Sequence, residues 1–206
     1  MTQLFQIHPV NPQLHLIHQI VQTIQEGGVI VYPTDSSYAL GCQIGNKKAI
    51  ERIRNIRQLD KFHNFTIVCR DLSELATYAR VNNSMFRLLK AYTPGAYTFI
   101  VPASKEVPKR LQHQKRKTIG IRIPNNSITM AILEELNEPL LSVTLIMSGE
   151  TVPLADPKII YERLEKQVEI VIDGGICDPQ PTTVIDFIDS EPHIVREGKG
   201  DITPFL

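Results

Sequence analysis

Hydroxyl and guanidinium side chains recur at the predicted ends of strands in this 206-residue chain. Such groups donate hydrogen bonds that satisfy the oxygens of carboxylates and phosphates. Each of them alone is equally consistent with a buried or a solvated structural group. Together they predict a pocket that binds an anion. The set comprises Thr34, Ser36, Arg57, Thr118, Arg122, Ser142, Thr144, Ser148, Thr182, Thr183 and Arg196.

The segment 27–42, GGVIVYPTDSSYALGC, contains the densest group of these polar side chains. Its β-branched run from Val29 to Tyr32 follows two glycines, which predicts a buried strand that delivers residues 33–38 to a sheet edge. A rigid strand that places small donors and acceptors at an edge is a common way to bind a polar small molecule or a phosphate. The alternative is a Pro-Thr-Asp turn with a capping aspartate, and the spacing does not separate the two.

The segment Lys105 to Lys117 is the one clear run of positive charge, with Glu106 as its single acid. Such a run is usually a solvated face of a helix or loop. The alternative is a surface for the phosphates of RNA, whose binding would depend strongly on salt. The RNA-binding candidates are Lys109, Arg110, Lys115, Arg116 and Lys117.

Several classes of site are excluded by motif and composition. Walker, dinucleotide-binding, zinc-protease and serine-hydrolase motifs are missing. Three widely spaced cysteines argue against a disulfide framework or a thiolate zinc site, and His15 with His18 lacks a third ligand nearby. Positive and negative side chains balance, so no global field attracts nucleic acid or membrane. With no basic leader and no apolar run of transmembrane length, we expect a soluble, cytoplasmic protein without a resident metal.

Amphipathic helices and apolar strands mostly alternate along the chain and must position these side chains. The strand predicted from Thr118 to Ile123 alternates isoleucines with Thr118, Gly120 and Arg122, so its second face is functional or exposed. The chain shows no linker or repeat, which predicts a single domain over residues 1–206 with a mixed sheet flanked by helices. Helices are predicted at 11–27 with an Asn11 cap, 47–57, 71–78, 84–90, 127–136 and 156–164. Further strands are predicted at 65–69, 97–101, 139–146, 168–172, 183–187 and 194–196.

Six strings occur in a fixed order along the chain: GGVIVYPTDSSYALGC from Gly27, RIRNIRQLDKFHNFTIV from Arg52, YTPGAYTFIVP from Tyr92, TIGIRIP from Thr118, TTVIDF from Thr182 and IVREGKGDI from Ile194. Their joint order is far more specific than any one string. On these strings the whole chain resembles the YrdC-like (threonylcarbamoyl-AMP synthase) family, most closely its YciO branch. The resemblance implies an α/β (α+β) domain with a twisted mixed parallel and antiparallel sheet and a large, positively lined concave cavity.

By this resemblance, synthase members condense L-threonine, bicarbonate and ATP into threonylcarbamoyl-adenylate, with release of pyrophosphate, for a tRNA modification. Such chemistry relies on positioning and charge rather than on a nucleophilic side chain. Mg²⁺ would be recruited mainly by the phosphates of ATP. The resemblance implies that Ser36, Arg122 and Thr182 face the threonine, with Arg122 pairing its carboxylate. It implies nucleotide or phosphate contacts for Arg57, Thr118, Thr144, Ser148 and Arg196.

Two departures from the synthase pattern bear on activity. Residues 57–59 read Arg-Gln-Leu where the pattern has Lys-x-Arg, and residues 144–146 read Thr-Leu-Ile where it has Ser-x-Asn. Leu59 and Ile146 therefore replace a cation and an amide. Each hydrogen bond lost to a charged group costs roughly 1.5 to 3 kcal/mol. If both losses fall on the transition state, the rate is expected to fall by roughly two to four powers of ten.

Three functions remain open. The first is a synthase-like nucleotidyltransferase that binds ATP and L-threonine, with weak or altered activity. The second is a protein that binds double-stranded RNA or tRNA without efficient catalysis, through the run at 105–117. The third is a nucleotide-binding protein that acts on another amine or acid, because Leu59 and Ile146 make the phosphate side of the pocket more apolar.

Overall fold

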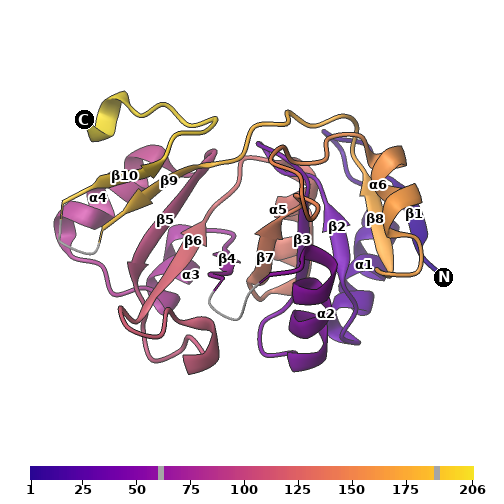
Figure 1. Cartoon of the computed structure of the whole chain (residues 1–206), viewed down its shortest axis with the longest axis horizontal. Helices are drawn as coiled ribbons and strands as arrows, with labels where there is room; N and C mark the ends of the chain where they lie inside the picture. The colour runs from indigo at the N-terminus through magenta and orange to yellow at the C-terminus, as the bar shows by residue number, and fades with distance from the viewer. Residues whose placement is uncertain (60–62, 188–190) are drawn as a thin grey trace.

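Ten strands form one sheet in the order β1-β8-β2-β3-β7-β4-β6-β5-β9-β10 (Figure 1). The computed structural model describes residues 1–59, 63–187 and 191–206, so residues 60–62 of the second string lie outside the described part. The strands are β1 (Gln3–Gln6), β2 (Ile30–Tyr32), β3 (Ala39–Gln43), β4 (Thr66–Val68), β5 (Tyr97–Pro102), β6 (Thr118–Arg122), β7 (Leu140–Thr144), β8 (Ile170–Asp173), β9 (Thr183–Asp186) and β10 (His193–Arg196).

The sheet mixes both pairing directions. Parallel pairs join β1 to β8, β8 to β2, β4 to β6 and β5 to β9. Antiparallel pairs join β2 to β3, β3 to β7, β7 to β4, β6 to β5 and β9 to β10. The predicted mixed, twisted α/β sheet is therefore confirmed.

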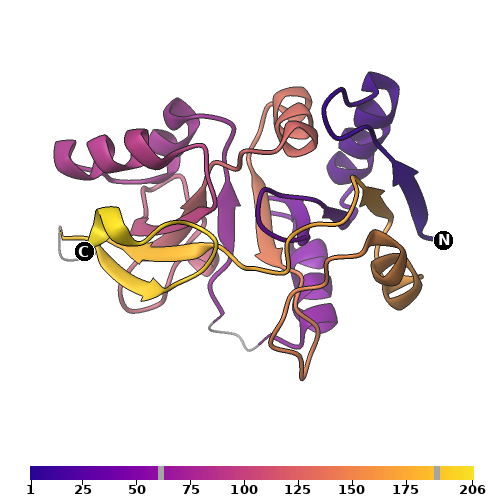
Figure 2. The same cartoon turned by 90° about the horizontal axis from the view of Figure 1, so that it is seen from above.

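Helices pack on both faces of the sheet, and the pattern in each strand decides which face they meet. The helices are α1 (Leu14–Gln25), α2 (Lys47–Arg57), α3 (Leu72–Tyr78), α4 (Asn83–Tyr92), α5 (Ser127–Leu136) and α6 (Pro157–Leu164), with short 3₁₀ turns η1 (Lys109–Leu111) and η2 (Thr203–Phe205). Ile30 and Tyr32 of β2 pack in the cluster under α1 and α5, whereas Val31 points into the cluster under α2. Figure 2 shows α1 and α5 on the side of the sheet opposite to α2 and α6.

Helix α2 ends in a way that fixes the direction of the residues after it. It begins at the predicted residue, because the Asn46 side chain accepts a hydrogen bond from the Ala49 amide at 3.1 Å. At its other end Gln58 adopts the left-handed conformation (φ 50°), and the Leu59 amide donates back to the Arg54 carbonyl at 2.9 Å. This is a Schellman ending, which typically turns an apolar residue in the Leu59 position back onto the helix. Leu59 indeed packs against the main core cluster.

Most predicted elements are present, and the differences have local causes. The expected Asn11 cap is wrong, because the Asn11 amide donates to His8 Nδ1 at 3.0 Å in a turn and α1 begins only at Leu14. Strands β1 and β3 were not predicted. β1 is a mostly exposed edge of four residues, and β3 is short and almost fully buried, so neither shows a two-residue alternation.

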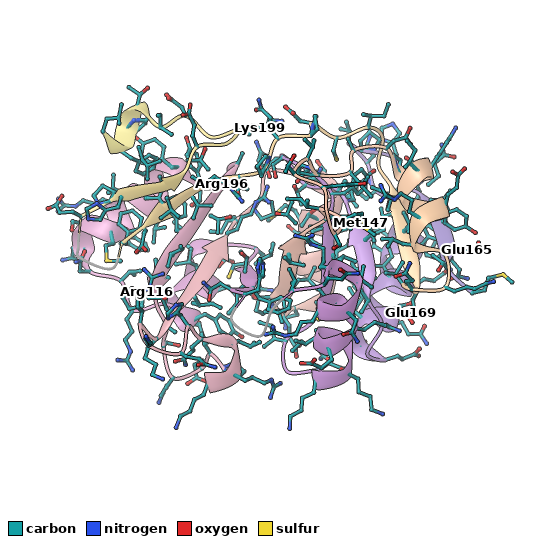
Figure 3. The ribbon with its side chains drawn as sticks, viewed as in Figure 1. Arg116, Met147, Glu165, Glu169, Arg196 and Lys199 are labelled. Atoms are coloured by element: carbon teal, nitrogen blue, oxygen red, sulfur yellow. The ribbon has the colours of Figure 1, made fainter. Side chains whose placement is uncertain are left out.

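A charged contact fixes the register between α2, β2 and β8. Glu169, labelled in Figure 3, accepts from the Val29 amide at 2.6 Å and from both Nη atoms of Arg52 at 2.8 and 2.5 Å. The contact is half exposed, so we expect it to add only about 1 kcal/mol to the stability of the fold.

Candidate functional site

A cavity of about 270 Å³ lies over strands that are neighbours in the sheet, namely β7, β4, β6, β5 and β9. Side chains from all five strands line it, together with the last residue of α2 and the last residue of β10. Its described lining residues are Arg57, His63, Asn64, Phe65, Thr66, Thr98, Ile100, Thr118, Ile119, Gly120, Val143, Thr144, Ile146, Thr182, Val184 and Arg196. They include two arginines, five threonines and no carboxylate, which favours an anionic ligand.

The register of the strands explains why hydroxyls meet on this floor. Gly120 of β6 is aligned with Thr66 of β4 on one side and with Ile100 of β5 on the other. A Cβ at Gly120 would lie 3.0 Å from Thr66 Oγ1 and 3.4 Å from Thr98 Cγ2. The glycine therefore keeps the centre of the floor low, and a larger residue would fill the space that a ligand needs.

Thr182 and Arg196 form one hydrogen-bonded group at the β9 side of the cavity. Arg196 donates from Nε and Nη2 to the Thr182 carbonyl at 3.1 and 2.8 Å, and from Nη2 to Thr182 Oγ1 at 3.2 Å. Thr182 Oγ1 also lies 2.8 Å from Thr98 Oγ1. In Figure 3, Arg196 and Lys199 lie to the left of Met147, which follows β7.

Arg122, at the end of β6, holds the polar loop at 33–38. Its Nη2 donates to Ser36 Oγ at 3.0 Å and to Thr34 Oγ1 at 3.2 Å, and it forms an ion pair with Asp35. Asp35 Oδ2 accepts from the Asn125 amide at 2.9 Å, which ties this loop to the one after β6. Arg122 Nε is buried and has no hydrogen-bond partner within the described structure.

Two arginines at the cavity, Arg196 and Arg57, have a pKa below the usual value for arginine. Partial desolvation lowers the pKa of Arg196, and the charge of Arg122 lowers it further. Burial lowers the pKa of Arg57, whose Nε likewise lacks a partner in the described part of the chain. A bound anion would relieve both effects, because it favours the charged form of a neighbouring guanidinium.

The loop at 33–38 is held from above by the connection between β8 and β9, which Figure 1 shows running along the top of the sheet. The Tyr38 hydroxyl donates to the Gly175 carbonyl at 2.7 Å and accepts from the Gly174 amide at 3.2 Å. Burial raises the pKa of Tyr38, so the hydroxyl keeps its proton. Ser36 is therefore presented by a loop that is fixed on two sides.

The candidate residues named from the sequence fall into three groups. Five of them line the cavity: Arg57, Thr118, Thr144, Thr182 and Arg196. Ser36 and Arg122 bond to each other, and Arg122 lies within electrostatic reach of Arg196. Ser148 is placed differently from the expectation, because it is exposed and donates to Gln58 Oε1 at 2.7 Å instead of lining the cavity.

Sequence reasoning missed Thr66, Thr98 and Asp35 as parts of this arrangement. Thr98 had a usable signal, because in β5 it alternates with the buried Tyr97, Phe99 and Val101. Asp35 was expected either at the sheet edge with the rest of its loop or as a turn cap, and its pairing with Arg122 across 87 residues could not be read from local spacing.

Comparison with known proteins agrees with this fold. The Sua5/YciO/YrdC family model, described as telomere recombination, matches residues 22–198. The chain belongs to this family. It is 58% identical to the YciO protein of Escherichia coli (strain K12) over the whole of both chains, and the crystal structure of E. coli YciO superposes with a TM-score of 0.97.

More distant members of the family are similar over most of this chain. The threonylcarbamoyl-AMP synthase of Vibrio vulnificus (strain YJ016) is 27% identical over 185 residues, covering 88% of this chain and 98% of that protein. The crystal structure of P. abyssi Sua5 complexed with L-threonine has a TM-score of 0.88 at 23% identity, covering 96% of this chain and 58% of that one. The likeness to Sua5 shows a shared fold.

The two departures from the synthase pattern lie in different places. Ile146 lines the cavity, as expected for a residue that replaces an amide donor. Leu59 was expected to make the phosphate side apolar, but it packs against the core and borders a separate groove beside Arg110. The left-handed Gln58 explains the difference, because it turns the chain away from the cavity after Arg57.

The basic run adjoins the cavity and its cations differ in availability. The five RNA-binding candidates, Lys109, Arg110, Lys115, Arg116 and Lys117, are all exposed. Arg116 pairs with Asp186 at 3.1 Å, and Arg110 donates to the Gly45 carbonyl at 2.6 Å. Among these five candidates, Lys109, Lys115 and Lys117 have neither an ion pair nor a side-chain hydrogen bond in the described part of the structure.

The described residues contain neither a cluster of metal-ligating side chains nor a membrane-spanning helix. They contain no group of three metal-ligating side chains, and the described cavity lining offers Mg²⁺ no carboxylate, so it does not fit a resident ion. Within the same residues, no helix has both the length and the apolar character that spanning a bilayer requires.

Proposed function

We propose that this family member binds ATP and L-threonine in the cavity and has weak or altered threonylcarbamoyl-AMP synthase-type activity. The observation that carries the proposal is a cavity whose described lining has five threonines, Arg57 and Arg196 but no carboxylate, together with the Arg122 side chain that bonds to Ser36. The Vibrio relative named as a synthase and the L-threonine complex of Sua5 support this choice of ligands. ATP would be a substrate, and Mg²⁺ would be bound mainly by the phosphates of ATP.

The threonine would lie near Ser36, Arg122 and Thr182. All three described hydrogen bonds of the Arg122 guanidinium leave from Nη2, so Asp35 does not use the whole group. A ligand carboxylate would bond to the remaining edge, and the Asp35 carboxylate would face a ligand ammonium group. The site would thus favour a zwitterion over a simple acid.

The nucleotide would lie on the threonine-lined floor, between Arg57 and Arg196. Thr118 and Thr144 supply hydroxyls there, and Gly120 leaves room for the ligand. Because Ile146 alone of the two departures lines the cavity, we expect one lost hydrogen bond to phosphate rather than two. The expected penalty is then about one to two powers of ten in rate.

The test is product formation by the purified protein from ATP, labelled bicarbonate and L-threonine. We expect slow formation of the adenylate by the wild type, none by Arg122→Ala, and wild-type rates from the matched control Ser148→Ala. A calorimetric panel of nucleotides and amino acids identifies a different amine or acid if L-threonine is not the ligand. Absence of any nucleotide binding by the wild type would refute the proposal.

A second candidate, binding of double-stranded RNA or tRNA without efficient catalysis, is favoured by the exposed lysines of the basic run. Lys109, Lys115 and Lys117 lie on one short segment next to the cavity, where a phosphate backbone could contact them. Binding through phosphates should weaken steeply as salt is raised. RNA binding that is absent or insensitive to salt would remove this candidate.

A further inference from the structure

The outer edge of strand β1 presents unpaired backbone hydrogen-bonding groups. β1 is the last strand at one end of the described sheet, where its one neighbour is β8 (Figure 1). The amides of Gln3 and Ile7 donate to carbonyls of the β8 segment at 2.8 and 2.9 Å. Because alternate residues of a strand direct their amides and carbonyls to opposite sides, those of Leu4 and Gln6 point away from β8. Such an edge is a template for pairing with another strand.

The edge at the other end of the sheet is protected against such pairing, whereas β1 is not. β10 contains a register shift between Ile194 and Arg196, and the exposed acids Glu191 and Glu197 flank it. Bulges and charged side chains are the usual means by which a free edge avoids other strands. β1 reads QLFQ and has no charge, no proline and an unbroken register with β8. β1 is therefore an edge that remains open to a partner.

The segment that contains β1 also lacks charge. Residues 1–25 include no lysine, arginine, aspartate or glutamate, although the chain's average of 21% would give about five. Histidines are the only titratable side chains of this segment. Three large apolar side chains within it, Leu4, Val10 and Leu14, are exposed. Depletion of charge together with exposed apolar side chains is typical of the centre of a protein interface.

These features favour a second copy of the chain as the partner. The unpaired groups are backbone groups in an extended strand, so the partner must present a strand edge of its own. A charged strand would find no opposite charge on β1. A second β1 is uncharged and has the same unpaired groups, and two identical edges related by a twofold axis pair antiparallel.

Contacts on either side of β1 limit the register in which two such strands can pair. A shift toward Thr2 would use the Thr2 carbonyl, which already accepts from the Tyr161 hydroxyl at 3.5 Å. A shift the other way would use the His8 amide, which already donates to Gln13 Oε1 at 3.0 Å. The register centred on Phe5 needs neither group.

We propose that this protein forms a twofold dimer in which β1 of one copy pairs antiparallel with β1 of the other. Phe5 lies opposite Phe5 of the second copy, and Leu4 of each copy exchanges two hydrogen bonds with Gln6 of the other. Every outward amide and carbonyl of Leu4 and Gln6 then has a partner, and the two sheets become one continuous sheet. The inference does not rest on the proposed function, because β1 lies outside the cavity.

The experiment compares Leu4→Lys with the matched control Val195→Lys, which adds the same charge at an exposed residue of the other edge strand, β10. Analytical ultracentrifugation of the full chain is run over a series of protein concentrations. We expect the wild type and Val195→Lys to form dimers and Leu4→Lys to remain a monomer, because the introduced lysine places a charge on the pairing edge. Both replaced side chains are exposed, so both variants should unfold at the temperature of the wild type.

Hydrogen exchange of single amides then locates the contact. The amides of Leu4 and Gln6 should be protected in the wild-type dimer and lose this protection when dilution dissociates it. Those of Gln3 and Ile7 should stay protected, because they bond to the β8 segment. A wild type that is monomeric at every concentration overturns the inference. A dimer that survives Leu4→Lys, that Val195→Lys also dissociates, or whose Leu4 and Gln6 amides exchange freely overturns it as well.

Discussion

Ile146→Asn should strengthen the phosphate contacts of the cavity, because it restores an amide donor at a position that faces the ligand space. Ile146 lines the cavity and is partly exposed, so its replacement by a polar side chain is expected to cost only about 1 kcal/mol of folding stability. A hydrogen bond to a charged phosphate contributes about 1.5 to 3 kcal/mol. If that bond is made in the transition state, the rate rises by about one to two powers of ten.

The assay measures adenylate formation from ATP, labelled bicarbonate and L-threonine, together with ATP affinity by calorimetry. Ile146→Val is the matched control, since it changes the size of the side chain without adding a donor. Leu59→Arg is the contrasting variant. It should give no gain in rate, because Leu59 packs against the core and the chain turns away from the cavity at Gln58.

Two outcomes would refute this reasoning. If Ile146→Asn changes neither the rate nor the ATP affinity relative to Ile146→Val, position 146 does not face the phosphates. If Leu59→Arg alone raises the rate, the direction assigned to Leu59 is wrong.

Two further predictions concern buried groups. Arg122→Ala should destabilise the fold by about 3 to 5 kcal/mol in guanidinium denaturation, because it leaves the nearly buried Asp35 carboxylate without its ion-pair partner. The double variant Arg122→Ala/Asp35→Asn should regain most of that stability without regaining L-threonine binding. A double variant as unstable as the single one would contradict this explanation. Burial raises the pKa of Tyr32 from 10.0 to about 12, so the unfolded chain loses this proton first as the pH rises. The contribution of Tyr32 to the free energy of unfolding is then full below pH 10 and falls by about 3 kcal/mol as the pH rises from 10 to 12. Tyr32→Phe should remove this part of the dependence of unfolding free energy on pH. The same dependence in wild type and variant would show that it does not come from Tyr32.

Local patterns were sufficient to predict the elements that carry strong periodicity or a cap. The helix from Lys47 to Arg57 has the predicted bounds. The alternation from Thr118 predicted a second face that is functional or exposed; the strand is buried, and Thr118 and Gly120 line the cavity. The two helices predicted to begin at Asp71 and Asp156 are capped by these residues, whose side chains accept from backbone amides at 2.8 and 2.9 Å. These features depend on neighbours within a few residues, which a sequence displays directly.

The arrangement of the site depended on information that local patterns do not contain. Thr182 and Arg196 meet because β9 and β10 pair with a shift in register, and the position of that shift is set by tertiary packing. Asp35 reaches Arg122 although β3, β7 and β4 separate β2 from β6 in the sheet, because the loop at 33–38 carries it from the end of β2 to the end of β6. The direction of Leu59 followed from the left-handed backbone conformation of Gln58, which is uncommon for a residue other than glycine and could not be predicted from a glutamine.

The place of β8 in the sheet has a consequence for biosynthesis. In the described sheet β1 has β8 as its neighbour, and β8 also separates β1 from β2. Residues near position 3 can therefore form their strand hydrogen bonds only after residues near position 170 are present. During translation the opening strand therefore leaves the ribosome long before its hydrogen-bonding partner has been made. Pairings so distant along the chain are slow to form, and we expect the nascent protein to keep an unfinished sheet margin until most of it has been synthesised.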